Sequence, residues 1–218
     1  MNKEWSNINK MFQENIKRAS TFKIGIDYLL SLRKMLYQQI MDLKDQCCGE
    51  DLKKKPLVKN KTIVYYVWHL ARIEDLVLHT LMLDKEQIYF KKGYHQLINA
   101  PLQTTGNELK MAELETFSKQ LIISELYNYL SDVYYESNTY LEKMNFDELM
   151  IKVSDERKRQ LISLEVVSLE EDAFWLVDYW CHKNYLGLLQ MPFSRHWIMH
   201  TENCLQILKK LEYEENIK

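Results

Sequence analysis

Apolar side chains recur every three to four residues in four long stretches of the chain, which is the spacing of one face of an α-helix. Each stretch is long enough for about six helical turns. Elsewhere, no segment shows the strict apolar–polar alternation of a half-buried strand. The sequence therefore predicts an all-α fold built on four long helices, at residues 21–46, 62–83, 124–145 and 193–214.

Local signals support these boundaries and add shorter elements. Thr62 is a suitable N-cap, and Pro192 lies at the first-turn position that proline tolerates best. A short helix is expected before residue 20, another from Ser154, and one at 169–189 that opens on the capping-box pattern Ser168–Glu171. Residues 84–122 are irregular, and we expect them to form a crossover or lid with short helices of its own.

Composition narrows the class of protein. The 218 residues, 46% of them apolar and 28% charged, fit one globular domain spanning residues 1–218. The formal net charge of −2 does not favour nucleic acid or an anionic membrane as a partner. The chain has neither a signal-peptide pattern nor an apolar run long enough to cross a membrane, and its four cysteines lack zinc-knuckle spacing. We expect free thiols and a cytoplasmic location.

Histidines carry the candidate chemistry. His196 and His200 lie four residues apart near a helix start, on one face and about 6 Å apart along the axis. His69 lies in the middle of the inward stripe of the 62–83 helix. Together the three would hold a divalent metal and leave a coordination position open, as catalytic sites do. Zinc fits this donor set best, although nickel, iron and manganese are not excluded.

Other interpretations of these residues stay open. His69, surrounded by tyrosines, could be a core histidine bonded to a phenol or a carbonyl, and the pair near the helix start could be exposed. Cys204 could be a soft ligand or a small buried apolar side chain. His79 and His95 show no partner pattern and are interpreted as incidental. The chain has no H-E-x-x-H motif, so a zinc protease is excluded.

Two segments resemble the DinB/YfiT-like family of metal-binding proteins: Trp68–Asp75 (WHLARIED) and Arg195–His200 (RHWIMH). The resemblance implies a four-helix bundle with an up-down-down-up course, often a homodimer. It also implies a metal held by one histidine of the second helix and a pair in the last, which are His69, His196 and His200 here. Helix order and length agree over most of the chain, but specific matching is confined to the two segments. Extra residues at 84–122 and 146–190 are expected to shape the pocket.

The resemblance also suggests a reaction. Characterised members of the family include transferases and isomerases that use low-molecular-weight thiols such as bacillithiol or mycothiol. It therefore implies a thiol S-transferase acting on a small electrophilic substrate, with a non-catalytic, stress-related metal- or ligand-binding bundle as the alternative. Arg72 would anchor a substrate carboxylate or phosphate, or else form an ion pair with a neighbouring helix. His182 would transfer a proton or support a ligand, or else lie in the core or an interface.

Overall fold

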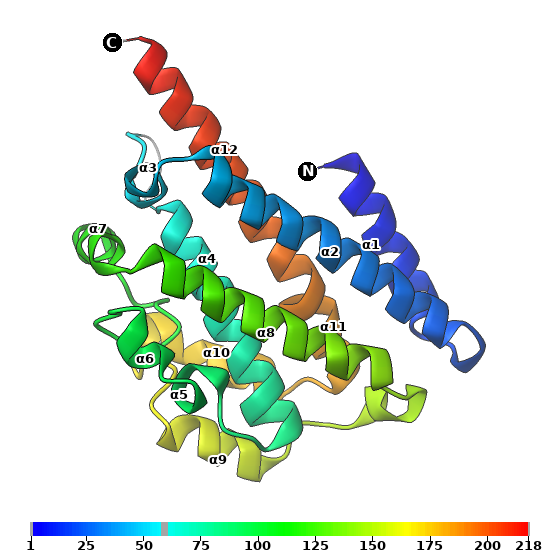
Figure 1. The fold of residues 1–218 in the computed structure, drawn as a ribbon. Coiled ribbons are helices and arrows are strands. Elements are labelled where there is room, and N and C mark those ends of the chain that lie inside the picture. Colours follow the sequence, from blue (N-terminus) through cyan, green and yellow to red (C-terminus); the bar gives the residue numbers. More distant parts are fainter. Residues whose placement is uncertain (1, 58–60, 218) are drawn as a thin grey trace.

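The computed structural model describes residues 2–57 and 61–217, and in these ranges the chain is helical with no β-strand (Figure 1). The predicted all-α class is thus confirmed. The structure also confirms the four predicted long helices within a few residues. They are α2 (Phe22–Gln46), α4 (Ile63–Asp75) with its π-helical continuation η2 (Leu76–Leu83), α8 (Ile123–Lys143) and α12 (His196–Asn216).

These four helices surround a common core, in which α2 and α4 each pack against both α8 and α12. Helix α2 runs antiparallel to α8, because Lys23 near its start donates to the carbonyl of Met144, whereas Tyr37 further along bonds to Ser131. Helix α4 runs parallel to α8 and antiparallel to α12, as Figure 1 shows. The tight antiparallel pairing therefore brings the middle of α4 against the start of α12.

A layer of buried polar groups divides the core along the bundle axis into two apolar clusters. Its centre is the ion pair of Arg33 on α2 with Glu74 on α4, at 2.6 Å between nitrogen and oxygen and with both side chains fully buried. Arg33 also donates to Asn138 and to the carbonyl of Phe193, and the indole of Trp197 donates to Glu74. The layer thus joins all four long helices at one level.

Helix α1 (Lys3–Asn15) lies along α2, and it buries the Trp5 and Phe12 side chains that mark its inner face. The backbone of Gly25, in the first turn of α2, passes very close to that of Ile16, the C-cap residue of α1. A Cβ atom at Gly25 would lie 2.7 Å from the Ile16 nitrogen. This close approach therefore requires glycine.

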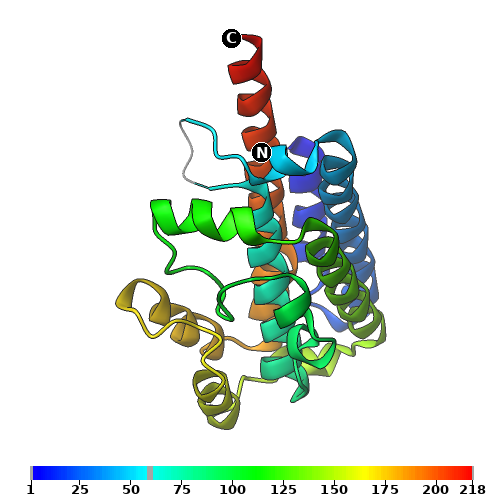
Figure 2. The same cartoon turned by 60° about the vertical axis from the view of Figure 1, so that its left-hand side comes forward.

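Shorter helices complete the fold around one side of α4. Helix α9 packs against η2, and α10 packs against α9 (Figure 2). The shorter elements are η1 (Ala19–Thr21), α3 (Gly49–Lys53), α5 (Ile88–Lys91), α6 (Tyr94–Leu97), α7 (Met111–Gln120), η3 (Phe146–Met150), α9 (Asp155–Ser163), α10 (Glu171–Cys181), α11 (Tyr185–Gln190) and the π-helical η4 (Met191–Arg195).

The predicted single helix at 169–189 is wrong, because the chain breaks it after Cys181. Asn184 caps a new helix through its side chain, which accepts from the backbone N–H of Gly187 at 3.0 Å. The break is also held by Tyr185, whose N–H bonds to the carbonyl of Ile151. The Ser168 capping box does not form either, since Ser168 accepts from Glu170 and helix α10 begins one residue later.

The helices and the cysteines can be compared with the expectations on membrane spans and free thiols. None of the helices in the described part of the chain is both long enough and apolar enough to cross a membrane. The four cysteines are free thiols, as predicted. Cys204 is fully buried, and burial raises the pKa of its thiol, so it packs as a small neutral side chain.

Candidate metal centre

Three histidine rings converge where the middle of α4 meets the start of α12. The ring centroids lie 5.1 Å apart for His69 and His196, 5.1 Å for His69 and His200, and 4.3 Å for His196 and His200. One nitrogen from each ring lies within 4.8 Å of the other two. The predicted convergence of these residues is confirmed, and their spacing could hold one metal ion.

The start of α12 explains how the pair comes to face α4. The preceding π-helical turn η4 carries Pro192 in its first positions, and the N–H of His196 bonds back to the carbonyl of Met191. Trp197 then anchors the helix by donating to the buried carboxylate of Glu74. Since residues four apart share a helix face, His196 and His200 both lie toward the pocket while Trp197 points into the core.

Hydrogen bonding fits these histidines to a metal. The Nδ1–H of His69 donates to the carbonyl of Thr105 at 2.8 Å, which leaves Nε2 as a lone-pair donor. The Nδ1 atoms of His196 and His200 are buried and have no hydrogen-bond partner among the described residues. Because unpartnered buried nitrogens are costly, a metal ion is a suitable occupant of this cluster.

The electrostatic environment keeps all three rings neutral. Burial lowers the pKa of His69 to about 4, against the opposing effect of the Thr105 carbonyl. Burial also lowers the pKa of His196 and His200 well below the ordinary value, and the neighbouring histidines and Lys61 lower it further. Neutral imidazole is the form that binds metal, so protons compete weakly for this site.

The histidines form the floor of a pocket of about 310 Å³. Helix α10 contributes a mainly aromatic wall, η4 contributes a methionine and a proline, and the start of α12 contributes a second methionine. A pocket beside the ligands gives a second molecule access to the metal position, which is what separates a catalytic from a closed structural site. The lining residues other than histidine are Lys61, Ile73, Asn107, Trp175, Leu176, Tyr179, Trp180, Met191, Pro192 and Met199.

Both segments that were expected to shape the pocket contribute to it. The 84–122 segment brings the Thr105 carbonyl onto His69 and places Asn107 at the pocket. Gly106 makes this turn possible with a φ of 73°, and its carbonyl accepts from Tyr65 at 3.1 Å. The 146–190 segment supplies α10, so most of the outer wall comes from this segment and not from the 84–122 segment that was expected to form a lid.

Arg72 lies outside the pocket. Its guanidinium is fully buried and donates to Gln87 at 2.9 Å and to the Gln103 carbonyl at 2.7 Å, with the ring of Tyr89 stacked 4.1 Å away. The alternative role, an ion pair with a neighbouring helix, is not observed either: the carboxylate near Arg72 is that of Asp75, 3.7 Å away on the same helix. Nothing in this position supports a role as substrate anchor.

His182 lies on the surface at the end of α10, also away from the pocket. By contrast, His79, which the sequence pattern treated as incidental, is buried between two carboxylates. Its Nδ1 lies 2.7 Å from Asp75 and its Nε2 3.1 Å from Glu136. The Glu136 partner belongs to another helix, so spacing along α4 could not indicate it.

Sequence reasoning also missed the non-histidine part of the pocket. Lys61 directly precedes the N-cap Thr62, and only the tertiary structure turns its side chain toward the site. The aromatic residues of α10 were the sequence feature that could have indicated its place at the pocket. Among them, Trp175 remains 53% exposed.

Comparison with known proteins finds a similar fold but indicates no activity. No family model matches the sequence, and no curated protein does. A crystal structure of a conserved protein of locus from Enterococcus faecalis is similar, with a TM-score of 0.61 over 84% of this chain and 95% of that chain. At 13% identity, the likeness concerns the fold alone.

Proposed function

We propose that this protein is a divalent-metal-dependent enzyme of the DinB-like type that transfers a low-molecular-weight thiol to a small electrophile. One observation carries the proposal: three buried, neutral histidines from two helices meet at the floor of a pocket large enough for a second small molecule. The parallel course of α4 and α8, antiparallel to α2 and α12, agrees with the up-down-down-up bundle that the resemblance implies.

Each part of the site has a distinct task in this proposal. His69, His196 and His200 hold the metal, and the Thr105 carbonyl keeps His69 in the tautomer that presents Nε2. A divalent metal supplies Lewis acidity, which lowers the pKa of a thiol that it binds. The aromatic side chains of α10 exclude water and orient the apolar part of the electrophile.

Zinc is the proposed metal because three neutral imidazoles suit it and leave the ion its full charge; nickel, iron and manganese are the alternatives. Bacillithiol or mycothiol is the proposed type of thiol. A homodimer and a cytoplasmic location remain predictions of the resemblance and of the composition.

The test begins with untagged protein, so that an affinity tag supplies no histidines. We expect about one metal ion per chain, and a cobalt-substituted sample whose absorption spectrum changes when thiol is added. Turnover of bacillithiol-type thiols with a chlorodinitrobenzene or an epoxide should require metal and disappear in His69→Ala. The exposed His182→Ala variant is the matched control and should keep both metal and turnover.

The same experiment can favour the alternative function. Metal bound at full occupancy, with no spectral response to any thiol and no metal-dependent turnover, would replace the transferase with a metal-binding bundle. A wild-type protein that takes up no divalent metal would overturn both.

A further inference from the structure

Lys61 is the cation of the histidine pocket. It lies just before helix α4, half-buried, and its Nζ donates to the hydroxyl of Tyr65 at 3.1 Å. The ammonium also lies 4.4 Å from the centre of the Tyr65 ring and 5.6 Å from that of Tyr66. These contacts hold the side chain beside the metal position, with its charge close enough to affect all three histidines.

The contacts of Lys61 are all with uncharged groups. Among the side chains that the structure describes, no carboxylate lies within ion-pair distance of its Nζ, and one of its three donors is used. Burial lowers the pKa of Lys61, which reflects this missing counter-charge. A half-buried ammonium without an anion is unfavourable, and so is a second positive charge from a metal next to it. An anion in the pocket would relieve both.

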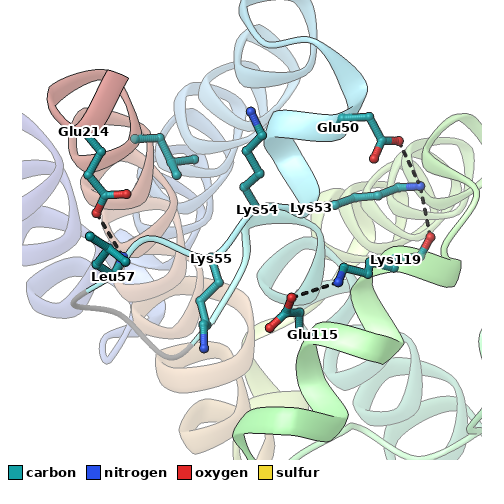
Figure 3. A pocket seen from close by; sticks show the side chains of 9 residues that line it. Glu50, Lys53, Lys54, Lys55, Leu57, Glu115, Lys119 and Glu214 are labelled. Atoms are coloured by element: carbon teal, nitrogen blue, oxygen red, sulfur yellow. Dashed lines mark hydrogen bonds and ion pairs between the residues drawn. The ribbon is translucent and has the colours of Figure 1, made fainter. Parts of the chain in front are cut away.

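A second pocket provides a comparison, because lysines there form ion pairs with carboxylates of the protein. Figure 3 shows this hollow of about 380 Å³ between α3, α7 and the end of α12. Here Lys119 pairs with Glu115 at 2.8 Å, and Lys53 lies 3.6 Å from Glu50 and donates to the carbonyl of residue 119. Lys53 and Lys119 in that pocket therefore have carboxylate partners, whereas Lys61 has none among the side chains that the structure describes.

We propose that Lys61 binds the anionic group of the substrate, so that the pocket selects small carboxylates whose apolar body lies against the aromatic wall. The geometry sets the two ends. The ammonium and the histidine cluster form the polar end, and Trp175, Tyr179 and Trp180 form the apolar end. Asn107 lies on the lining as well and offers an amide to a carboxylate oxygen. This inference deepens the proposed function, since it names the substrate class of the same site.

Binding measurements on the metal-loaded full-length protein test it with two matched probes. Benzoate carries the charge, and benzamide has the same shape without it. Calorimetry and quenching of the pocket tryptophans should show benzoate binding about tenfold to a hundredfold more tightly than benzamide, the range for one charge-assisted hydrogen bond. Lys61→Met should remove this preference, and Lys61→Arg should retain most of it.

The control is Lys119→Met, which removes the same charge from the paired pocket and should leave both affinities unchanged. Mercaptoacetate compared with 2-mercaptoethanol distinguishes a carboxylate on the thiol from one on the electrophile. If Lys61→Met weakens only mercaptoacetate, the anionic group belongs to the thiol. If benzoate binds no better than benzamide, or the preference survives in Lys61→Met, the proposal is overturned.

Failure of this inference can be told apart from failure of the metal site. Lys61→Met should keep full metal content, which also shows that the variant folds. His200→Ala should lose metal yet keep a Lys61-dependent preference for benzoate. In the wild-type protein, anion selectivity with no metal uptake would support Lys61 and reject the metalloenzyme, and metal uptake with no anion selectivity would do the reverse.

Discussion

Two histidines on one helix, His69 and His79, show how different surroundings shift the pKa of the same residue type in opposite directions. Both are buried, with 4% and 2% of their surfaces exposed. His69 donates to a backbone carbonyl and otherwise faces neutral histidines and the charge of Lys61, and burial lowers its pKa to about 4. Burial acts in the same direction on His79, but the hydrogen bonds and charges of Asp75 and Glu136 outweigh it and raise the pKa.

Burial by itself therefore does not decide what a histidine can do. Asp75 lies beside His79 and also accepts from the backbone N–H groups of Ile88 and Tyr89 and from the hydroxyl of Tyr129. The two carboxylates raise the pKa of His79, so it holds its proton to a higher pH than His69 does. Among the side chains that the structure describes, no carboxylate forms a hydrogen bond or ion pair with His69. The lone pair of its Nε2 is therefore available to a metal.

Removing each ring in turn gives the largest expected difference. His69→Ala should reduce metal content from about one ion per chain to the background level, because two histidines alone hold a divalent ion weakly. His79→Ala should leave metal content unchanged. Elemental analysis after dialysis against metal-free buffer makes the comparison, and equal metal loss in the two variants would contradict it.

Glu74 lies on the helix between the two histidines and tests the framework that both depend on. Glu74→Ala leaves Arg33 as an unpaired buried charge and frees Trp197, so we expect a loss of about 3–5 kcal/mol in the free energy of unfolding. Urea denaturation measures it. Glu86→Ala, at an exposed position, is the control. A similar loss of unfolding free energy in that variant would show that the buried polar layer does not specifically stabilise the fold.

The charge of His79 should be visible as a pH dependence. Its pKa is higher in the folded than in the unfolded protein, so its contribution to stability is complete below about pH 6.5 and is lost as pH rises through the folded value. His79→Gln should lower the free energy of unfolding by about 1–3 kcal/mol at pH 6 and by less at pH 9. His182→Gln serves as the control, and an identical deficit at both pH values would show that His79 is neutral.

A smaller effect should follow from disturbing the turn that supports His69. Gly106→Ala places a methyl group 3.3 Å from the Tyr65 ring at a φ of 73°, a backbone conformation that costs alanine about 1 kcal/mol. Metal affinity should fall by about tenfold as the Thr105 carbonyl shifts, as for other losses of support to a ligand. Competition with a chelator measures it. Gly93→Ala, a positive-φ glycine with open space around it, should not weaken metal binding.

The sequence by itself determined the parts that depend on short-range periodicity. Apolar spacing indicated the four long helices, and Thr62 marked the start of α4 through a cap that does form. The four-residue spacing of His196 and His200 placed both on one face, and the resemblance of two segments added His69. These features depend on residues within a few helical turns of one another, so the local sequence contains enough information to predict them.

Tertiary structure decided the features that join distant residues. Glu136 reaches His79 from another helix, and Lys61 turns toward the histidines. Helix α10 lines the pocket and ends at a break that the pattern across 169–189 did not indicate. Arg72 resembled a site residue because it lies one turn from His69, yet the bonds to Gln87 and Gln103 hold it in the core. Helical spacing says which residues share a face, but the charge and reactivity of a side chain depend on the neighbours that packing supplies.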